Sequence, residues 1–299
     1  MSRYLVTGGS GRLGRSVVEV LAAAGHEVIS VDRTPHDGGV ARHVACDLSD
    51  AAATAACFAE IRPDAVVHLA AIAVPFDRPD PELFATNTGL AFSVLEASLA
   101  AGVASLLFAS SPTVIGYGAP AGWKPAYLPI DEKHPVAPWN GYSLSKQAVE
   151  NIAAMAVLAH GARIRIGVFR PCYVIAPEEW AGAPTQQGHT VAERLDHVEL
   201  SAVALFNYVD ARDAGDFVLA WLEHAHEVPN GSTFFVGASD ALAREPVAEL
   251  AARYRPELTD AVGALTGSSA VFTSELAERL LGWRASRSWR TELAIEGAP

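Results

Sequence analysis

The stretch Arg3-Tyr4-Leu5-Val6-Thr7-Gly8-Gly9-Ser10-Gly11-Arg12-Leu13-Gly14 decides the fold of this chain. Its apolar start predicts a short buried strand, and apolar residues at helical spacing after the last glycine predict a helix. Glycine permits the positive φ of a tight turn, a second glycine lets the backbone approach a pyrophosphate, and a third lets the helix pack close to the strand. The helix N-terminus then offers N–H groups and a positive dipole end to phosphates. Phosphate contacts are therefore predicted at Gly8, Gly11, Arg12, Leu13 and Gly14.

A second strand is predicted at residues 27–31, and it ends at Asp32. An acidic residue about twenty positions past the glycines suits the adenosine ribose hydroxyls of a dinucleotide. Its charge would repel a 2′-phosphate, which favours NAD, whereas Arg33 and Arg12 could pair with that phosphate and leave NADP possible. The alternative is a glycine-rich turn without a ligand, which the order of strand, glycines, helix, strand and acid disfavours.

Strands and helices continue to alternate along the first half of the chain. Further strands are predicted at 42–45, 65–69, 105–109 and 164–170, and helices at 51–60, 81–101 and 142–160. Short apolar strands alternating with helices predict an α/β fold, a Rossmann-type doubly wound parallel sheet covered on both faces. Ligands of such sheets bind beyond the carboxyl ends of the strands.

The alternation loosens after Pro171, and the chain resumes with an expected strand at 204–209, a helix at 211–223 and a last strand at 232–236. We therefore expect a dinucleotide-binding domain and a small C-terminal substrate-binding lobe. The domain would comprise residues 1–171 plus 204–237, and the lobe residues 172–203 plus 238–299.

The composition is that of a globular protein with an acidic balance. The chain has 299 residues, 50% of them hydrophobic and 19% charged, and a formal net charge of −12. Acidity argues against nucleic acid or an anionic membrane as a partner. No apolar stretch approaches ~20 residues, so we expect no membrane span, and Met1 leads into the first strand without a signal peptide.

The cysteines are Cys46, Cys57 and Cys172, without paired spacing. This pattern fits reduced thiols and a cytoplasmic location. The ten histidines show no metal-like spacing, so no metal is assigned.

Tyr142 and Lys146 lie in the run Gly141-Tyr142-Ser143-Leu144-Ser145-Lys146, four residues apart on a predicted helix. Both side chains therefore point the same way. Free tyrosine titrates near pH ~10, and a nearby ammonium shielded from water favours the phenolate. The pair predicts a catalytic base, although the same spacing occurs by chance in many helices.

Together with further motifs, these residues resemble the extended short-chain dehydrogenase/reductase family, within its NAD-dependent epimerase/dehydratase group. The motifs are the glycine stretch, Asp47-Leu48, His68-Leu69-Ala70-Ala71, Asn87, Ser110-Ser111, Tyr142 with Lys146, Arg170-Pro171, Tyr208-Val209-Asp210 and Leu281-Gly282-Trp283. The resemblance implies that Tyr142 is the acid/base and that Lys146 holds the nicotinamide ribose and lowers the phenol's pKa. Ser111 would hydrogen-bond the reacting oxygen.

The resemblance also assigns cofactor contacts. Asp47 and Leu48 would contact adenine, Leu69, Ala70 and Ala71 would form the wall beside the cofactor, and Asn87 and Pro171 would complete the site. Ordinary structural roles remain open for several of these: a strand-end cap for Ser111, a helix N-cap for Asp47 and a packing role for Asn87. For His68 a structural role is favoured over catalysis.

Departures from the family pattern narrow the expected function. Pro112-Thr113 replaces the Asp-Glu that follows the catalytic hydroxyl in dehydratases, so dehydration is disfavoured. Ile115-Gly116-Tyr117 resembles the uronate dehydrogenases. Arg194 is the only arginine between Pro171 and Tyr208, and a diphosphate needs cationic or N–H partners. Only about three dozen residues separate Pro171 from Tyr208. This short segment and its single arginine both favour a small substrate that carries no nucleotide.

Candidate substrate contacts lie after strand ends or beside Tyr142, and each could also be ordinary core. They are Ile72, Val74, Pro75, Thr113, Trp139, Asn140, Cys172 and Tyr173.

The favoured function is an NAD(P)-dependent oxidoreductase. It would transfer a hydride between nicotinamide and a hydroxyl-bearing carbon or carbonyl of a small sugar-like substrate, with Tyr142 as acid/base. The alternatives are a nucleotide-sugar epimerase with tightly bound NAD and a non-enzymatic dinucleotide sensor. A homodimer is expected, formed through helices 81–101 and 142–160, although their apolar stripe could equally be core.

Overall fold

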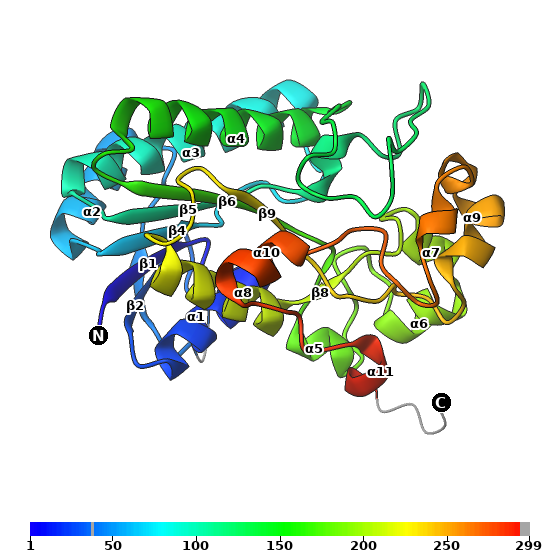
Figure 1. Cartoon of the computed structure of the whole chain (residues 1–299). Helices are drawn as coiled ribbons and strands as arrows, with labels where there is room; N and C mark the ends of the chain where they lie inside the picture. Colours follow the sequence, from blue (N-terminus) through cyan, green and yellow to red (C-terminus); the bar gives the residue numbers. More distant parts are fainter. Residues whose placement is uncertain (37–38, 294–299) are drawn as a thin grey trace.

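A computed structural model describes residues 1–36 and 39–293 of the chain. Its centre is a seven-stranded sheet with the order β3-β2-β1-β4-β5-β6-β9, in which every neighbouring pair is parallel. The strands are β1 (Arg3–Thr7), β2 (Glu27–Asp32), β3 (Arg42–Ala45), β4 (Ala65–His68), β5 (Ser105–Ala109), β6 (Arg165–Pro171) and β9 (Thr233–Val236). The predicted doubly wound α/β fold is confirmed (Figure 1).

Helices cover both faces of the sheet. They are α1 (Arg12–Ala23), α8 (Ala211–His224) and α10 (Glu275–Leu281) on one side, and α2 (Ala51–Ile61), α3 (Asp80–Ala101) and α4 (Gly141–His160) on the other (Figure 1). Alternate strand residues feed two separate cores: Val6 and Val67 pack on the α1 side, and Leu5 and Val66 pack on the α3 side. This two-sided burial explains why the strands read as continuous apolar runs.

Helix α3 departs from the expectation that no apolar stretch is long enough to span a membrane. By length and composition alone it passes that test, with a mean hydropathy of 1.2. It packs between α2 and α4, and its buried residues include Leu83, Val94 and Leu95.

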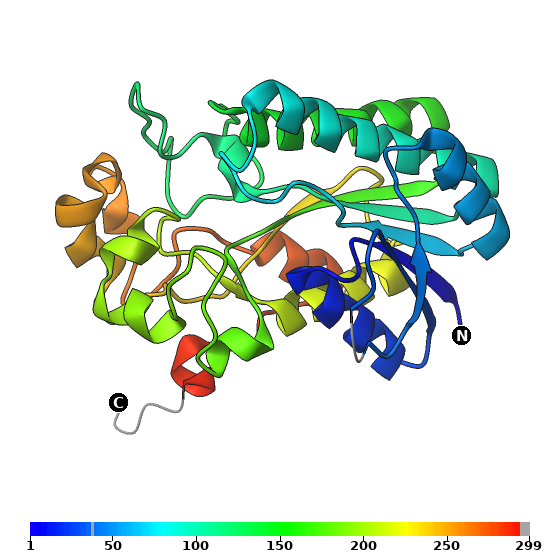
Figure 2. The ribbon, with the colours of Figure 1, turned by 180° about the vertical axis from the view of Figure 1, so that it is seen from behind.

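The chain beyond β6 forms short elements past the carboxyl ends of the strands (Figures 1 and 2). They are β7 (Val174–Ile175), α5 (Pro177–Trp180), α6 (Val191–Asp196), α7 (Glu199–Ala202), β8 (Val209–Asp210), α9 (Val247–Tyr254) and α11 (Trp289–Glu292). Strands β7 and β8 pair with each other and not with the central sheet.

The expected strand at residues 204–209 is wrong over most of its length. Leu205 and Phe206 have φ angles of 54° and 58°, which turn the chain and cannot continue a strand. Both side chains are fully buried. A buried apolar turn has the same composition as a buried strand, so the apolar run did not distinguish them.

Candidate active site

The glycine turn after β1 is as tight as its sequence predicts. Gly8 has a φ of 71°, and a Cβ there would lie 2.8 Å from the Ala70 nitrogen. A Cβ on Gly14 would lie 2.1 Å from the Gly8 carbonyl oxygen, so only glycine lets α1 start this close to the strand. The first-turn N–H groups of α1 have no partners within the helix and are available to an anion.

Asp32 lies at the end of β2 and holds the glycine turn in place. Its carboxylate accepts hydrogen bonds from the Ser10 nitrogen at 3.3 Å and from the Arg33 nitrogen at 2.7 Å. The Arg33 side chain is exposed. The Arg12 side chain instead forms an ion pair with Glu179 of α5, and Arg15 pairs with Glu178.

Asp47 is not the cap of α2. Its carboxylate accepts hydrogen bonds from the backbone nitrogen and the hydroxyl of Ser49, which lower its pKa, whereas Asp50 caps the helix through Ala52 and Ala53. The Leu48 side chain is buried in the core on the α3 side. The alternative that Asp47 is the N-cap of α2 is therefore wrong.

The wall beside the glycine turn is built around His68 at the end of β4. The His68 Nδ1 lies 2.8 Å from the Thr7 hydroxyl, which also accepts a hydrogen bond from the Ala70 nitrogen. Burial, and secondarily the nearby Lys146, lowers the pKa of His68 to about 3, so the imidazole is neutral at physiological pH. Leu69, Ala70 and Ala71 follow it as half-buried residues, and the backbone of Leu69 and Ala70 lies against Gly8.

Helix α4 places Tyr142 and Lys146 side by side in its first two turns. Both are buried, and the Lys146 ammonium lies 5.9 Å from the centre of the Tyr142 ring. Its Nζ donates to the Ala109 carbonyl at the end of β5, at 2.9 Å. Burial lowers the pKa of Lys146 to about 8.

The phenol differs from the sequence-based expectation of a lowered pKa. Burial raises the pKa of Tyr142, and a hydrogen bond with Ser111 opposes this rise. The physical reason is that the ammonium points to the Ala109 carbonyl while the phenol is sealed from water. The structure nevertheless brings Ser111, Tyr142 and Lys146 together as predicted.

Ser111 has two roles at once. Its hydroxyl accepts hydrogen bonds from the Thr113 nitrogen at 3.3 Å and the Thr113 hydroxyl at 3.0 Å, so it caps the short helix η1 (Pro112–Ile115). It also faces the Tyr142 phenol. The two hydrogen bonds from Thr113 therefore fix the position of the Ser111 hydroxyl.

A buried ion pair that the sequence reasoning missed fixes α4 against the sheet. Glu150 accepts hydrogen bonds from Arg170 Nε and Nη2, both at 2.8 Å, and from the Ser110 hydroxyl at 2.6 Å. Glu150 lies four residues after Lys146, as Lys146 does after Tyr142, so helical spacing could have found it. The pair and the Ser110 hydrogen bond join α4 to the ends of β5 and β6.

Asn87 and Asn140 act mainly on the backbone. Asn87 exchanges hydrogen bonds with the nitrogen and carbonyl of Ile72 and donates to the Ser145 hydroxyl at 3.0 Å, which ties α3 to α4 and to the loop after β4. Asn140 is the N-cap of α4 and accepts from the Ser143 nitrogen at 2.8 Å. The capping role of Asn140 was not anticipated from sequence.

Two of the remaining candidates, Trp139 and Cys172, lie next to a second tyrosine. Tyr117 is partly buried, and desolvation, followed by its neighbours Cys172 and Tyr142, raises its pKa. Trp139 donates its indole N–H to the Tyr117 carbonyl at 3.1 Å. Burial also raises the pKa of the Cys172 thiol, which makes it an inert side chain at neutral pH.

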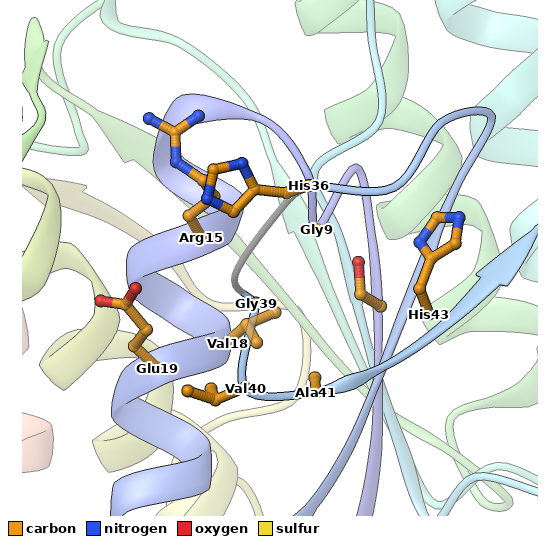
Figure 3. Close-up of a pocket in the computed structure, with 10 residues that line it drawn as sticks. Gly9, Arg15, Val18, Glu19, His36, Gly39, Val40, Ala41 and His43 are labelled. Atoms are coloured by element: carbon orange, nitrogen blue, oxygen red, sulfur yellow. The ribbon is translucent and has the colours of Figure 1, made fainter.

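A small cavity of about 30 Å³ lies beneath the glycine turn, between α1 and the segment that connects β2 with β3 (Figure 3). Its lining includes Gly9, Arg15, Ser30 and His43. It has room for a water molecule but not for a sugar, and Tyr142 does not line it. Within residues 1–36 and 39–293, no group of three or more potential metal ligands is present.

Comparison with known proteins agrees with this architecture. The model of the NAD dependent epimerase/dehydratase family matches residues 4–237. A solved UDP-glucose-4-epimerase from Stenotrophomonas maltophila, 22% identical, superposes with a TM-score of 0.73 and covers 98% of this chain and 96% of that chain, which shows a shared fold.

Two curated relatives are similar in sequence. A UDP-glucose 4-epimerase from Azospirillum brasilense is 32% identical over 208 residues, which are 67% of this chain and 57% of that protein. A uronate dehydrogenase from Agrobacterium fabrum is 35% identical over 177 residues, 57% of this chain and 63% of that protein. The chain thus spans less than two thirds of either relative's length. The resemblance inferred from the motifs is confirmed: the chain belongs to the NAD dependent epimerase/dehydratase family.

Proposed function

We propose that this protein is an NAD-dependent oxidoreductase acting on a hydroxyl-bearing carbon, or the corresponding carbonyl, of a small sugar-like molecule. The observation that carries the proposal is the cluster of Tyr142, Ser111 and Lys146 at the carboxyl end of β5. A nicotinamide supplies the hydride acceptor when bound. Tyr142 takes the proton of the substrate hydroxyl, and Ser111 holds the reacting oxygen.

The residues around the glycine turn fit a dinucleotide. A Cβ at Gly8 or Gly14 would collide with backbone, so the turn presents bare backbone and the α1 N-terminus to a pyrophosphate. Lys146 donates one bond to Ala109, which leaves ammonium protons for ribose hydroxyls. Asp47, Leu48, the wall at 69–71, Asn87 and Pro171 remain the proposed adenine-side and nicotinamide-side neighbours.

NAD is preferred over NADP for an electrostatic reason. The Asp32 carboxylate lies at the end of β2, where ribose hydroxyls are held in this fold. Arg12 is committed to Glu179, so Arg33 is the remaining one of the two candidate partners for a 2′-phosphate. Relatives with solved structures carry bound NAD, including the epimerase from Stenotrophomonas maltophila.

The proposal is tested by NADH formation, read at 340 nm, on a panel of aldoses, polyols and uronates, with NADP offered in parallel. Oxidation of at least one panel member with NAD favoured over NADP is expected. Failure of every member in both directions, with NAD bound to the protein, would contradict the oxidoreductase and leave an epimerase that retains its NAD or a dinucleotide sensor.

The similarity to UDP-glucose 4-epimerases supports one second candidate, an epimerase that retains its NAD. That function predicts interconversion of UDP-sugars without net NADH and measurable affinity for UDP. We place it second because Arg194 is the single arginine between Pro171 and Tyr208 that could meet a diphosphate.

A further inference from the structure

Arg15, near the start of α1, contacts the glycine turn and α5 at the same time. Its Nη1 lies 3.5 Å from the Ser10 carbonyl oxygen, and its Nη2 forms an ion pair with Glu178 of α5. The Arg15 side chain is the more buried of the two, with 22% of its surface exposed against 48% for Glu178. An acid that water can reach therefore holds this guanidinium beside the glycine turn.

Ser10 connects Arg15 to the end of β2. The Ser10 nitrogen donates to the Asp32 carboxylate at 3.3 Å, and its hydroxyl donates to the Thr34 carbonyl at 2.7 Å. In this fold the acid at the end of β2 holds the adenosine ribose hydroxyls of a dinucleotide. Arg15 is thus separated from the expected ribose position by a single residue, Ser10.

Arg15 also borders the segment that follows β2. It lines the cavity of about 30 Å³ between α1 and this segment, together with Ser30 and His36 (Figure 3). The cavity holds at most a water molecule, but it shows that Arg15 and the residues after Asp32 face the same space. A phosphate added to the ribose therefore enters a region that the Arg15 side chain can reach.

The other arginine of the first turn is held differently. Arg12 pairs with Glu179, which is buried and also accepts a hydrogen bond from the Ala176 nitrogen at 2.9 Å. Arg12 lies near Tyr173, beyond the end of β6. In contrast, no backbone group of residues 1–36 and 39–293 donates to the Glu178 carboxylate. Glu178 is therefore held less firmly than Glu179, and the pair with Arg15 is the one that an incoming anion can exchange.

We propose that Glu178 is a specificity residue for the cofactor: it keeps Arg15 from a 2′-phosphate and so favours NAD over NADP. The inference rests on the proposed function and deepens it. NAD has no group that needs Arg15, so it binds without breaking the ion pair. NADP adds a phosphate monoester with a charge between about −1.5 and −2, next to Asp32. Arg15 can balance that charge only by leaving Glu178.

The test is the Kd of NADPH and of NADH, measured by fluorescence titration of the full chain at low ionic strength. Glu178→Gln keeps the shape of the side chain and removes its charge, and its half-exposed position lets the variant fold. The Kd of NADPH is expected to fall about 10-fold, because Arg15 gains a charge-assisted contact with the phosphate. The Kd of NADH should stay within about two-fold. An unchanged Kd of NADPH would overturn the proposal.

A second variant tests whether Glu178 acts through Arg15. In the double variant Arg15→Met with Glu178→Gln, the Kd of NADPH is expected to return to the wild-type value, because the cation that met the phosphate is gone. A gain in NADPH affinity that persists without Arg15 would overturn this role of Glu178.

The matched control is Glu27→Gln. Glu27 pairs with Arg3 at the amino ends of β1 and β2, and the two side chains are about as exposed as Glu178. This variant changes the net charge by the same amount at the opposite edge of the sheet, so the ratio of the two Kd values should not change. An equal gain in NADPH affinity would show an effect of net charge alone and would refute the proposal.

Binding without substrate separates failure of this inference from failure of the proposed function. Tighter NADPH binding by Glu178→Gln, with no sugar oxidised by the wild type, would retain the specificity residue and refute the oxidoreductase. Sugar oxidation with NAD, together with unchanged NADPH affinity in Glu178→Gln, would retain the oxidoreductase and refute the specificity residue. A wild type that binds neither NADH nor NADPH would contradict both.

Discussion

At the scale of single residues, burial dominates the electrostatics of the site. Tyr142, Lys146 and His68 are all sealed from water, and burial disfavours the charged form of each. The sequence spacing identified the tyrosine–lysine pair correctly but not the direction of the phenol's pKa. That direction depends on where the lysine's protons go, which is to Ala109, a residue 37 positions away in the chain.

Lys146 gives a pH dependence of stability that can be measured. Its folded pKa of about 8 lies below the unfolded value of 10.5, so between these values the folded protein binds fewer protons than the unfolded one. Stability therefore rises with pH across this window, by about 3 kcal/mol from this group. The free energy of unfolding is measured in urea at pH 7.5 and 10.5, for the wild type and for Lys146→Met. The wild-type value minus the variant value should increase between these two pH values. If it stays constant or decreases, Lys146 is not a buried ammonium.

At the scale of elements, the site depends on how closely α1 and α4 approach the sheet. Gly14→Ala would place a methyl group 2.1 Å from the Gly8 carbonyl oxygen, so α1 must shift away from the turn. We expect this variant to lose NAD binding, which a fluorescence titration with NADH measures. The control is Gly89→Ala, in open space within α3, which is expected to stabilise the fold by about 0.5–1 kcal/mol. Unchanged NADH affinity in Gly14→Ala would refute the close approach.

The ion pair between Glu150 and Arg170 should matter for the position of α4. Glu150→Gln leaves a buried guanidinium without its charge partner, and a loss of about 3–5 kcal/mol in unfolding free energy is expected. Glu60→Gln is the control, because its pair with Arg42 is exposed and should contribute less than about 1 kcal/mol. Similar urea midpoints for Glu150→Gln and Glu60→Gln would show that the Glu150–Arg170 pair does not stabilise the packing of α4 on the sheet.

Elements with strong periodicity were predictable, and turns with buried apolar residues were not. The bounds of β4, α3, α4 and α8 agree with the sequence pattern within a residue or two. The strand predicted at 204–209 was wrong because Leu205 and Phe206 are buried in a left-handed turn. An apolar composition does not distinguish such a turn from a buried strand. The Glu150–Arg170 and Arg15–Glu178 contacts join residues that are distant in the sequence, so they depend on tertiary packing.

At the scale of the whole molecule, one feature holds distant parts of the chain together and another concerns the contact between two copies. Helix α5, beyond the carboxyl ends of the strands, is joined to α1 by ion pairs of Glu178 with Arg15 and of Glu179 with Arg12. On the opposite layer, α3 and α4 leave apolar side chains on the surface, namely Phe92, Leu144, Met155 and Leu158. Exposed large apolar residues on two helices that pack against each other suit an interface, and we propose a homodimer through this layer.

The dimer is tested by multi-angle light scattering. Leu158, with 90% of its surface exposed, costs the monomer nothing when it becomes charged, so Leu158→Glu is expected to shift a dimeric mass to the monomer's 31.5 kDa. Val203→Glu, at an exposed apolar position just after α7, should leave the mass unchanged. A wild-type protein that is already monomeric would contradict the proposed interface.

The central claim is that the Tyr142 phenol is the acid/base of a hydride transfer, and Tyr142→Phe tests it most directly. The variant keeps the buried ring and removes only the hydroxyl, so NADH should bind as tightly as in the wild type, as measured by fluorescence. The rate of NADH formation at saturating substrate is expected to fall by about 10²–10⁴-fold, the usual contribution of a positioned acid/base. A Tyr142→Phe variant that binds NADH normally and turns over at the wild-type rate would contradict the account.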